Sequence, residues 1–129
     1  MKPAEYLEFI ELFNREKFFE AHEVLELLWR REKGGVHRLI KRQSAAGSSG
    51  TVRSARRDFY HGLIQIAAAC VHIQRGTPEG GKQLLTTSAK YLKPYLPIFM
   101  ELNLEKLLAE TRAALFEGGK FPRLTLGKK

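Results

Sequence analysis

The chain has 129 residues and a net charge of +8, with 43% hydrophobic and 28% charged residues. This length is typical of one domain with one core, and the composition is too apolar for a disordered chain. The single cysteine, Cys70, excludes an internal disulfide and a multi-cysteine zinc site. We therefore expect a single domain over 1–129.

The first residues do not have the pattern of a secretory leader. Glu5, Glu8 and Glu11 interrupt the apolar residues that follow Met1. No apolar run approaches the roughly 20 residues that a membrane-spanning helix needs. The sequence thus predicts a cytoplasmic protein without membrane association.

Two helices are predicted in the first third of the chain. Pro3 suits a first helical turn, and apolar residues at helical spacing predict a helix over about 3–13. After the polar break 14–17, a second apolar stripe predicts a helix up to about Glu32. This stripe consists of Phe18, Ala21, Leu25, Leu28 and Trp29.

The composition changes after the second predicted helix. Gly34 and Gly35 predict its end, and the Ser- and Gly-rich run 44–50 is typical of a flexible segment. The stretch 34–57 holds six basic side chains and no acidic one. We therefore expect a flexible basic insertion at about 34–54.

The third predicted helix begins near Arg53 or Asp58 and ends at about Arg75. Gly76 then provides a residue suited to a left-handed stop. The centre of this helix is apolar on nearly every side, which is typical of a helix in the middle of a bundle.

Residues that typically begin or end a helix predict the fourth and fifth helices. Thr77 and Pro78 suit an N-cap and a first helical residue, and Pro94 ends the fourth helix. Asn103 is suited to cap a fifth helix, which Gly118 closes.

A helix–turn–helix pattern occurs twice. Aligning residue 13 with residue 73 places Ala21 over Gly81, and a small residue there lets the helices of a hairpin approach closely. Two copies are fewer than the roughly three that form a stable solenoid. We therefore predict an all-α fold, a compact bundle of about five helices made of two helical hairpins and a C-terminal helix.

Polar side chains concentrate on the second predicted helix. His22 and Glu26 lie one turn apart on one face, and Glu20 and Glu23 lie close by. Glu23 and Glu26 have a spacing found among carboxylate ligands in helical bundles. The His22 and Glu26 pair suits metal binding, orientation of the histidine as a base, or a helix-stabilising hydrogen bond.

The third helix carries His61, Gln65 and His72 at intervals of four and seven, along one stripe of an otherwise apolar surface. A buried polar group without a partner costs on the order of 1–3 kcal/mol. We therefore expect these side chains to find partners on the second helix, at His22 or Glu26.

This polar cluster has two interpretations: a metal or small-ligand site between helices, or a polar network that fixes how two hairpins dock. A di-iron Glu-x-x-His motif would need glutamate where Phe19 and Ala69 stand. A zinc His-Glu-x-x-His motif fails because position 26 is glutamate. The pattern favours the structural interpretation and leaves metal binding open.

Other candidate groups are fewer. Trp29 continues the stripe of Leu25 and is expected to anchor the core, and Cys70 is expected to be a buried apolar residue. The sequence contains no nucleophile motif, phosphate-binding loop or dinucleotide fingerprint. Arg53, Arg56 and Arg57 suit weak contacts with phosphates, but the basic segment has no aromatic residue for base stacking.

Two blocks of sequence carry a family resemblance. They are Phe13-Asn14-x-x-x-Phe18-Phe19-Glu20-Ala21-His22-Glu23-Val24-Leu25-Glu26-x-x-Trp29 and Arg57-Asp58-Phe59-Tyr60-x-Gly62-Leu63-Ile64-Gln65, followed by His72-x-x-Arg75-Gly76. These blocks resemble domain of unknown function 309, a bacterial and archaeal family. The resemblance covers about 5–95 and implies a compact all-helical fold without an assigned activity. It also implies the motif residues Glu20, His22, Glu23, Glu26, Trp29, Gln65 and His72.

We therefore expect a non-enzymatic binding or scaffold module whose candidate site consists of those seven residues. The alternative is a metal-dependent or acid–base enzyme that uses His22, Glu23, Glu26 and His72. A third interpretation is weak nucleic-acid binding through the basic loop, which the sequence disfavours. The sequence names no cofactor, catalytic residue or substrate, and leaves a protein partner or a homo-oligomer open.

Overall fold

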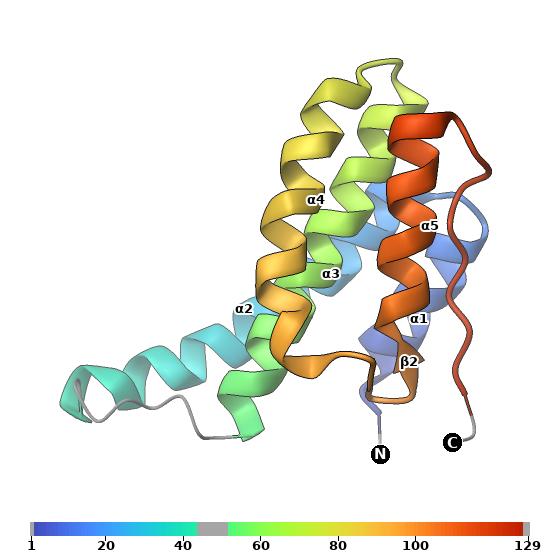
Figure 1. Cartoon of the computed structure of the whole chain (residues 1–129). Helices are drawn as coiled ribbons and strands as arrows, with labels where there is room; N and C mark the ends of the chain where they lie inside the picture. Colours follow the sequence, from blue (N-terminus) through green and yellow to red (C-terminus); the bar gives the residue numbers. More distant parts are fainter. Residues whose placement is uncertain (1, 44–51, 128–129) are drawn as a thin grey trace.

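The computed structural model describes the backbone of residues 2–43 and 52–127, and their side chains except at 32–43 and 52–54. Five helices pack in contact with one another, which confirms the predicted all-α fold class (Figure 1). The helices are α1 (Ala4–Asn14), α2 (Phe18–Gln43), α3 (Val52–Gln74), α4 (Pro78–Leu92) and α5 (Leu104–Glu117).

Helix α3 lies at the centre of the arrangement. It contacts α2 on one side and α4 on another, while α1 packs on α2 and α5 packs on α4 and α3 (Figure 1). The two hairpins, α1–α2 and α3–α4, are therefore joined through α3. The aromatic side chains buried where they meet are Tyr6, Phe9, Phe13, Phe18, Phe59 and Tyr60.

Several helix ends are set by single residues, as predicted. Gly76 and Gly118 have φ angles of 78° and 70°, so each occupies the left-handed region that favours glycine. The Asn103 side chain accepts a hydrogen bond of 2.9 Å from the Lys106 backbone N–H and caps α5. Thr77 stands at the N-cap position of α4, but its side chain makes no capping hydrogen bond.

The prediction that Gly34 and Gly35 end the second helix is wrong, because α2 continues to Gln43. A glycine lowers helix stability by about 1 kcal/mol but adopts helical dihedral angles freely, so it does not by itself stop a helix. Figure 1 shows the last turns of α2 extending beyond the other helices beside the start of α3. The remaining part of the predicted flexible insertion, 44–51, lies outside the described residues.

A short connection and an extended tail complete the fold. The 3-10 turn η3 (Lys93–Tyr95) leads into an antiparallel pair, β1 (Ile98–Phe99) and β2 (Leu102–Asn103). The tail runs back along α5 and α1, where Asn14 makes two hydrogen bonds of 2.7 Å to the Leu124 backbone (Figure 1). None of the described helices combines the length and hydrophobicity needed to cross a membrane.

Gly81 permits the close approach of α4 to α3, as its alignment with Ala21 predicts. A Cβ atom there would lie 2.9 Å from the Ala69 carbonyl oxygen and 2.7 Å from Leu115 Cδ2. Because the carbonyl belongs to a helix backbone, the contact cannot be relieved by a side-chain rotation alone. The α3–α4 interface therefore requires glycine at this position.

We expect Gly81→Ala to lower the free energy of unfolding by about 1–2 kcal/mol, because the clash outweighs the helix-propensity gain of about 1 kcal/mol. Urea denaturation followed by circular dichroism measures this change. The matched control is Gly119→Ala, since a Cβ there would meet nothing closer than 3.7 Å. Equal stability of the two variants would contradict the packing argument.

Candidate functional site

A pocket of about 240 Å³ lies between α2 and α3, with one wall from α4. One part of its lining is polar and the other is apolar, which is typical of sites that bind small molecules. The lining residues are His22, Glu26 and Trp29 from α2, His61, Ile64, Gln65 and Ala68 from α3, and Leu84 from α4.

His61 contacts Gln65, Trp29 and Tyr91. Gln65 Nε2 lies 3.1 Å from His61 Nε2, the Trp29 ring meets the imidazole edge-on at 5.0 Å, and the Tyr91 ring stacks on it at 4.3 Å. The amide and the two aromatic rings therefore fix the orientation of the His61 ring at the pocket.

His22 and Glu26 lie one turn apart on α2, at the polar side of the pocket. His22 Nδ1 is buried without a hydrogen-bond partner among the described residues. Glu26 forms an ion pair of 3.6 Å with Arg30, whose side chain is 64% exposed. Such an exposed pair is worth only about 0.3–0.5 kcal/mol, so the Glu26 carboxylate remains available to another cation.

The other three predicted residues lie elsewhere. Glu20 and Glu23 are exposed and line a separate groove beside α1. His72 is not among the residues that line the pocket. Its Nδ1 lies 2.9 Å from the Thr77 hydroxyl, and its ring packs directly over Gly80.

The expected partnership of His72 with His22 or Glu26 is therefore wrong. Thr77 follows His72 by only five residues, across the tight turn at Gly76. The turn places the Thr77 hydroxyl next to the imidazole, so His72 Nδ1 has a local partner rather than one on α2. The pocket unites His22, Glu26, Trp29 and Gln65 but leaves out Glu20, Glu23 and His72.

The match to a family model covers residues 6–43 and 49–84, more than half of the chain. The model describes the domain of unknown function DUF309. The chain belongs to this family. No match is found among curated proteins.

All eight residues that line the α2–α3 pocket fall within the segments matched to DUF309. The pocket is thus built from the part of the chain that defines the family. Helix α5, the β1–β2 pair and the tail lie beyond the match.

The sequence places His61 on one helical stripe with Gln65, facing the second helix, but the motif residues implied by the family resemblance do not include it. Tyr91, whose ring stacks on His61, was not predicted at this pocket. Its spacing of seven residues from Leu84 is the sequence signal that puts both on the same face of α4.

The polar groups of the pocket lining are two imidazoles, one carboxylate, one amide and one indole. Among the described side chains, no three His, Cys, Asp or Glu residues lie close enough to share a metal ion. Within the described part of the chain, no serine, threonine or cysteine lines the pocket. Cys70 is fully buried in the core as predicted, and this burial raises its pKa to about 12.

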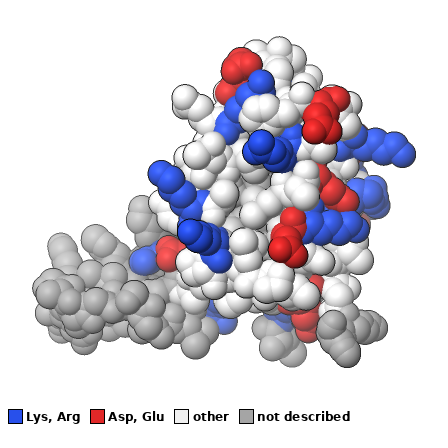
Figure 2. All heavy atoms as spheres, viewed as in Figure 1, with Lys and Arg blue, Asp and Glu red and all other residues white. Residues whose placement is uncertain are grey.

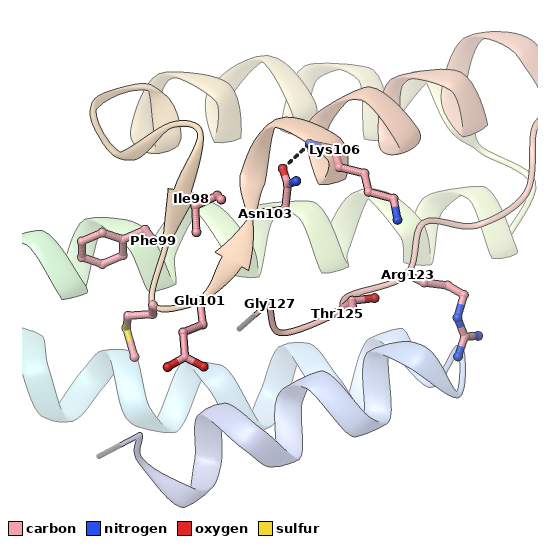
Figure 3. A pocket seen from close by; sticks show the side chains of 9 residues that line it. Ile98, Phe99, Glu101, Asn103, Lys106, Arg123, Thr125 and Gly127 are labelled. Carbon is pink, nitrogen blue, oxygen red and sulfur yellow. Dashed lines mark hydrogen bonds between the residues drawn. The ribbon is translucent and has the colours of Figure 1, made fainter. Parts of the chain in front are cut away.

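A second pocket, of about 520 Å³, opens between the β1–β2 pair, the start of α5 and the tail (Figure 3). Its polar groups already have structural partners. Glu101 pairs with Lys2 at 2.9 Å, Arg123 donates to the Asn14 carbonyl, and Asn103 caps α5. It lies wholly outside the family match, and its side chains do not converge on one point (Figure 3). We therefore assign the candidate site to the α2–α3 pocket.

Cys70 in the folded protein should react with Ellman's reagent at pH 8 at least about 100-fold more slowly than a free thiol, because it is buried and protonated. In urea the same thiol should react completely. The raised pKa also means that the free energy of unfolding falls as the pH rises above about 8.5, where the unfolded thiol ionises. A fast reaction in the folded state would show that the core opens at Cys70.

Proposed function

We propose that the chain is a non-enzymatic binding module that holds a small organic ammonium compound in the α2–α3 pocket. One observation supports this proposal: the carboxylate of Glu26 and three apolar side chains line the same pocket of about 240 Å³. Ile64, Ala68 and Leu84 offer an apolar surface to the body of the ligand, and Glu26 offers a counter-charge to its ammonium group.

The charge of the lining supports a cationic ligand. Among the described side chains, Glu26 is the one acidic group in the lining, and no lysine or arginine joins it. The Trp29 ring provides a second favourable surface, because an indole attracts a cation by about 0.5–2 kcal/mol. Arg30 neutralises Glu26 only weakly, since the pair is 3.6 Å apart and solvent-exposed, so an ammonium group can displace it.

The enzymatic alternative has less support. It requires His22, Glu23, Glu26 and His72 to act together, yet only His22 and Glu26 line the pocket. General acid–base chemistry also needs a reacting atom within reach of both groups. The unpartnered His22 Nδ1 fits a binding role, since a ligand hydroxyl or amine hydrogen would satisfy it.

Benzylammonium is a suitable probe, because it combines a flat apolar body with one ammonium group. Trp29 is the only tryptophan, so its indole N–H signal in a two-dimensional NMR spectrum reports on this pocket alone. We expect this signal to shift and to saturate with a Kd on the order of 1 mM, which is reasonable for eight non-hydrogen atoms. Benzyl alcohol, which lacks the charge, should bind at least about fivefold more weakly.

Two variants test the role of the carboxylate. Glu26→Gln should weaken benzylammonium binding at least about fivefold, since the amide keeps the shape and loses the charge. Glu23→Gln removes a carboxylate from the same helix outside the pocket and should leave the affinity unchanged. Equal binding by all three proteins, or equal losses in both variants, would refute the proposal.

A further inference from the structure

A basic groove of about 390 Å³ lies between α4 and α5. Its cationic side chains are Lys82, Lys90, Lys93 and Arg112, and none of the described residues that line it is acidic. Figure 2 views this face and shows basic side chains spaced along α4 and toward α5. Lys90, Lys93 and Arg112 have no ion-pair partner among the described residues.

The floor of this basic groove is apolar. Leu85 and Ala89 lie along it, and the Phe116 ring stands at its edge with 51% of its surface exposed. Lys82 Nζ lies 4.6 Å from the centre of that ring, and the Arg112 guanidinium lies 5.0 Å from it. An apolar floor between cations suits a partner with acidic groups around an exposed apolar residue.

A surface of that description lies on another face of the same chain. The acidic groove beside α1 and α2 has a volume of about 630 Å³ and is lined by four carboxylates, from Glu8, Glu20, Glu23 and Glu26, and by one cation, Arg30, which pairs with Glu26. Leu27, 58% exposed, stands among them. In the described part of the chain, no cation pairs with the first three of these carboxylates.

We propose that the basic groove of one copy receives the acidic groove of a second copy. The two grooves have opposite net charge, each has an exposed apolar side chain, and each has three charged groups without an ion-pair partner among the described residues. Contact between them would pair these charges and cover Phe116 and Leu27 together. Because the two surfaces differ, the contact is head-to-tail, and it can propagate to a third copy or close into a ring.

The strength of this contact should depend on salt in a defined way. Exposed ion pairs contribute little each, so we expect a dissociation constant on the order of 0.1 mM. At about 0.1 M salt the Debye length is about 10 Å, which screens the repulsion from the net charge of +8 but not the contacts within the interface. At about 1 M salt it is about 3 Å, and the pairs themselves are weakened.

Sedimentation equilibrium of the whole chain tests the proposal. In about 0.1 M NaCl, the average mass should rise as the protein concentration increases from about 10 µM to about 1 mM. In about 1 M NaCl it should remain that of the monomer. Monomeric behaviour under both conditions would overturn the proposal, including the case in which the wild type instead binds an oligonucleotide or polyglutamate.

Charge reversal provides the matched controls. One variant carries Lys90→Glu, Lys93→Glu and Arg112→Glu, and the other carries Glu8→Lys, Glu20→Lys and Glu23→Lys. All six side chains are exposed, so both proteins should fold, which circular dichroism checks. Each variant alone has two grooves of the same sign and should stay monomeric.

An equal mixture of the two variants should associate again, because it contains one copy with acidic grooves and one with basic grooves. This rescue cannot arise from a loss of stability. A mixture that stays monomeric while the wild type associates would overturn the proposed pairing. Glu26 is left intact in both variants, and benzylammonium binding is measured on the wild type at a protein concentration where it is monomeric, so a failure of one proposal can be told from a failure of the other.

Discussion

The rest of the structure depends on the packing of α3 between α2 and α4. Its apolar surface, including Leu63, Ile66 and Ala67, is buried without leaving a face for solvent over most of its length. Burial on both sides requires the neighbouring backbones to come close. Gly81 allows this close approach on α4. Ala21, the residue aligned with it on α2, is fully buried.

The same central position explains where the pocket forms. A helix buried on all sides can carry polar residues only where its neighbours leave room or provide partners. At His61 and Gln65, α3 faces the wider space between α2 and α4, and the two side chains bond each other. The pocket therefore lies where the polar pair of His61 and Gln65 replaces apolar packing. The rings of Trp29 and Tyr91 contact His61 there.

The sequence predicts those features that local chemistry decides. Gly76 and Gly118 mark helix ends because few other residues adopt a left-handed conformation cheaply, and Asn103 caps a helix with its own side chain. Gly34 and Gly35 misled the prediction, since the continuation of a helix past glycine also depends on the residues on either side of it and on their packing. The strands β1 and β2 have two residues each, too few to show the alternation that reveals a strand.

The candidate site also contains features that the sequence predicts and features that it does not. Helical spacing places His22 and Glu26 together, but it cannot decide which neighbour each side chain faces. Since successive residues turn by about 100°, Glu23 leaves the pocket and joins the acidic groove. The spacing of seven residues from Gln65 predicts that His72 lies on the same face of α3. The turn after α3, however, places the Thr77 hydroxyl within hydrogen-bonding distance of His72.

Glu26 lines both the α2–α3 pocket and the acidic groove, so the two proposals meet at one carboxylate. A bound ammonium group would attract the Glu26 carboxylate toward the α2–α3 pocket. The basic groove of a second copy would attract the same carboxylate toward the acidic groove. Linkage requires the effect to be reciprocal: if the ligand weakens self-association, then self-association weakens ligand binding by the same factor. The net charge of +8 gives no hint of this coupling, because it depends on where one carboxylate lies rather than on the total.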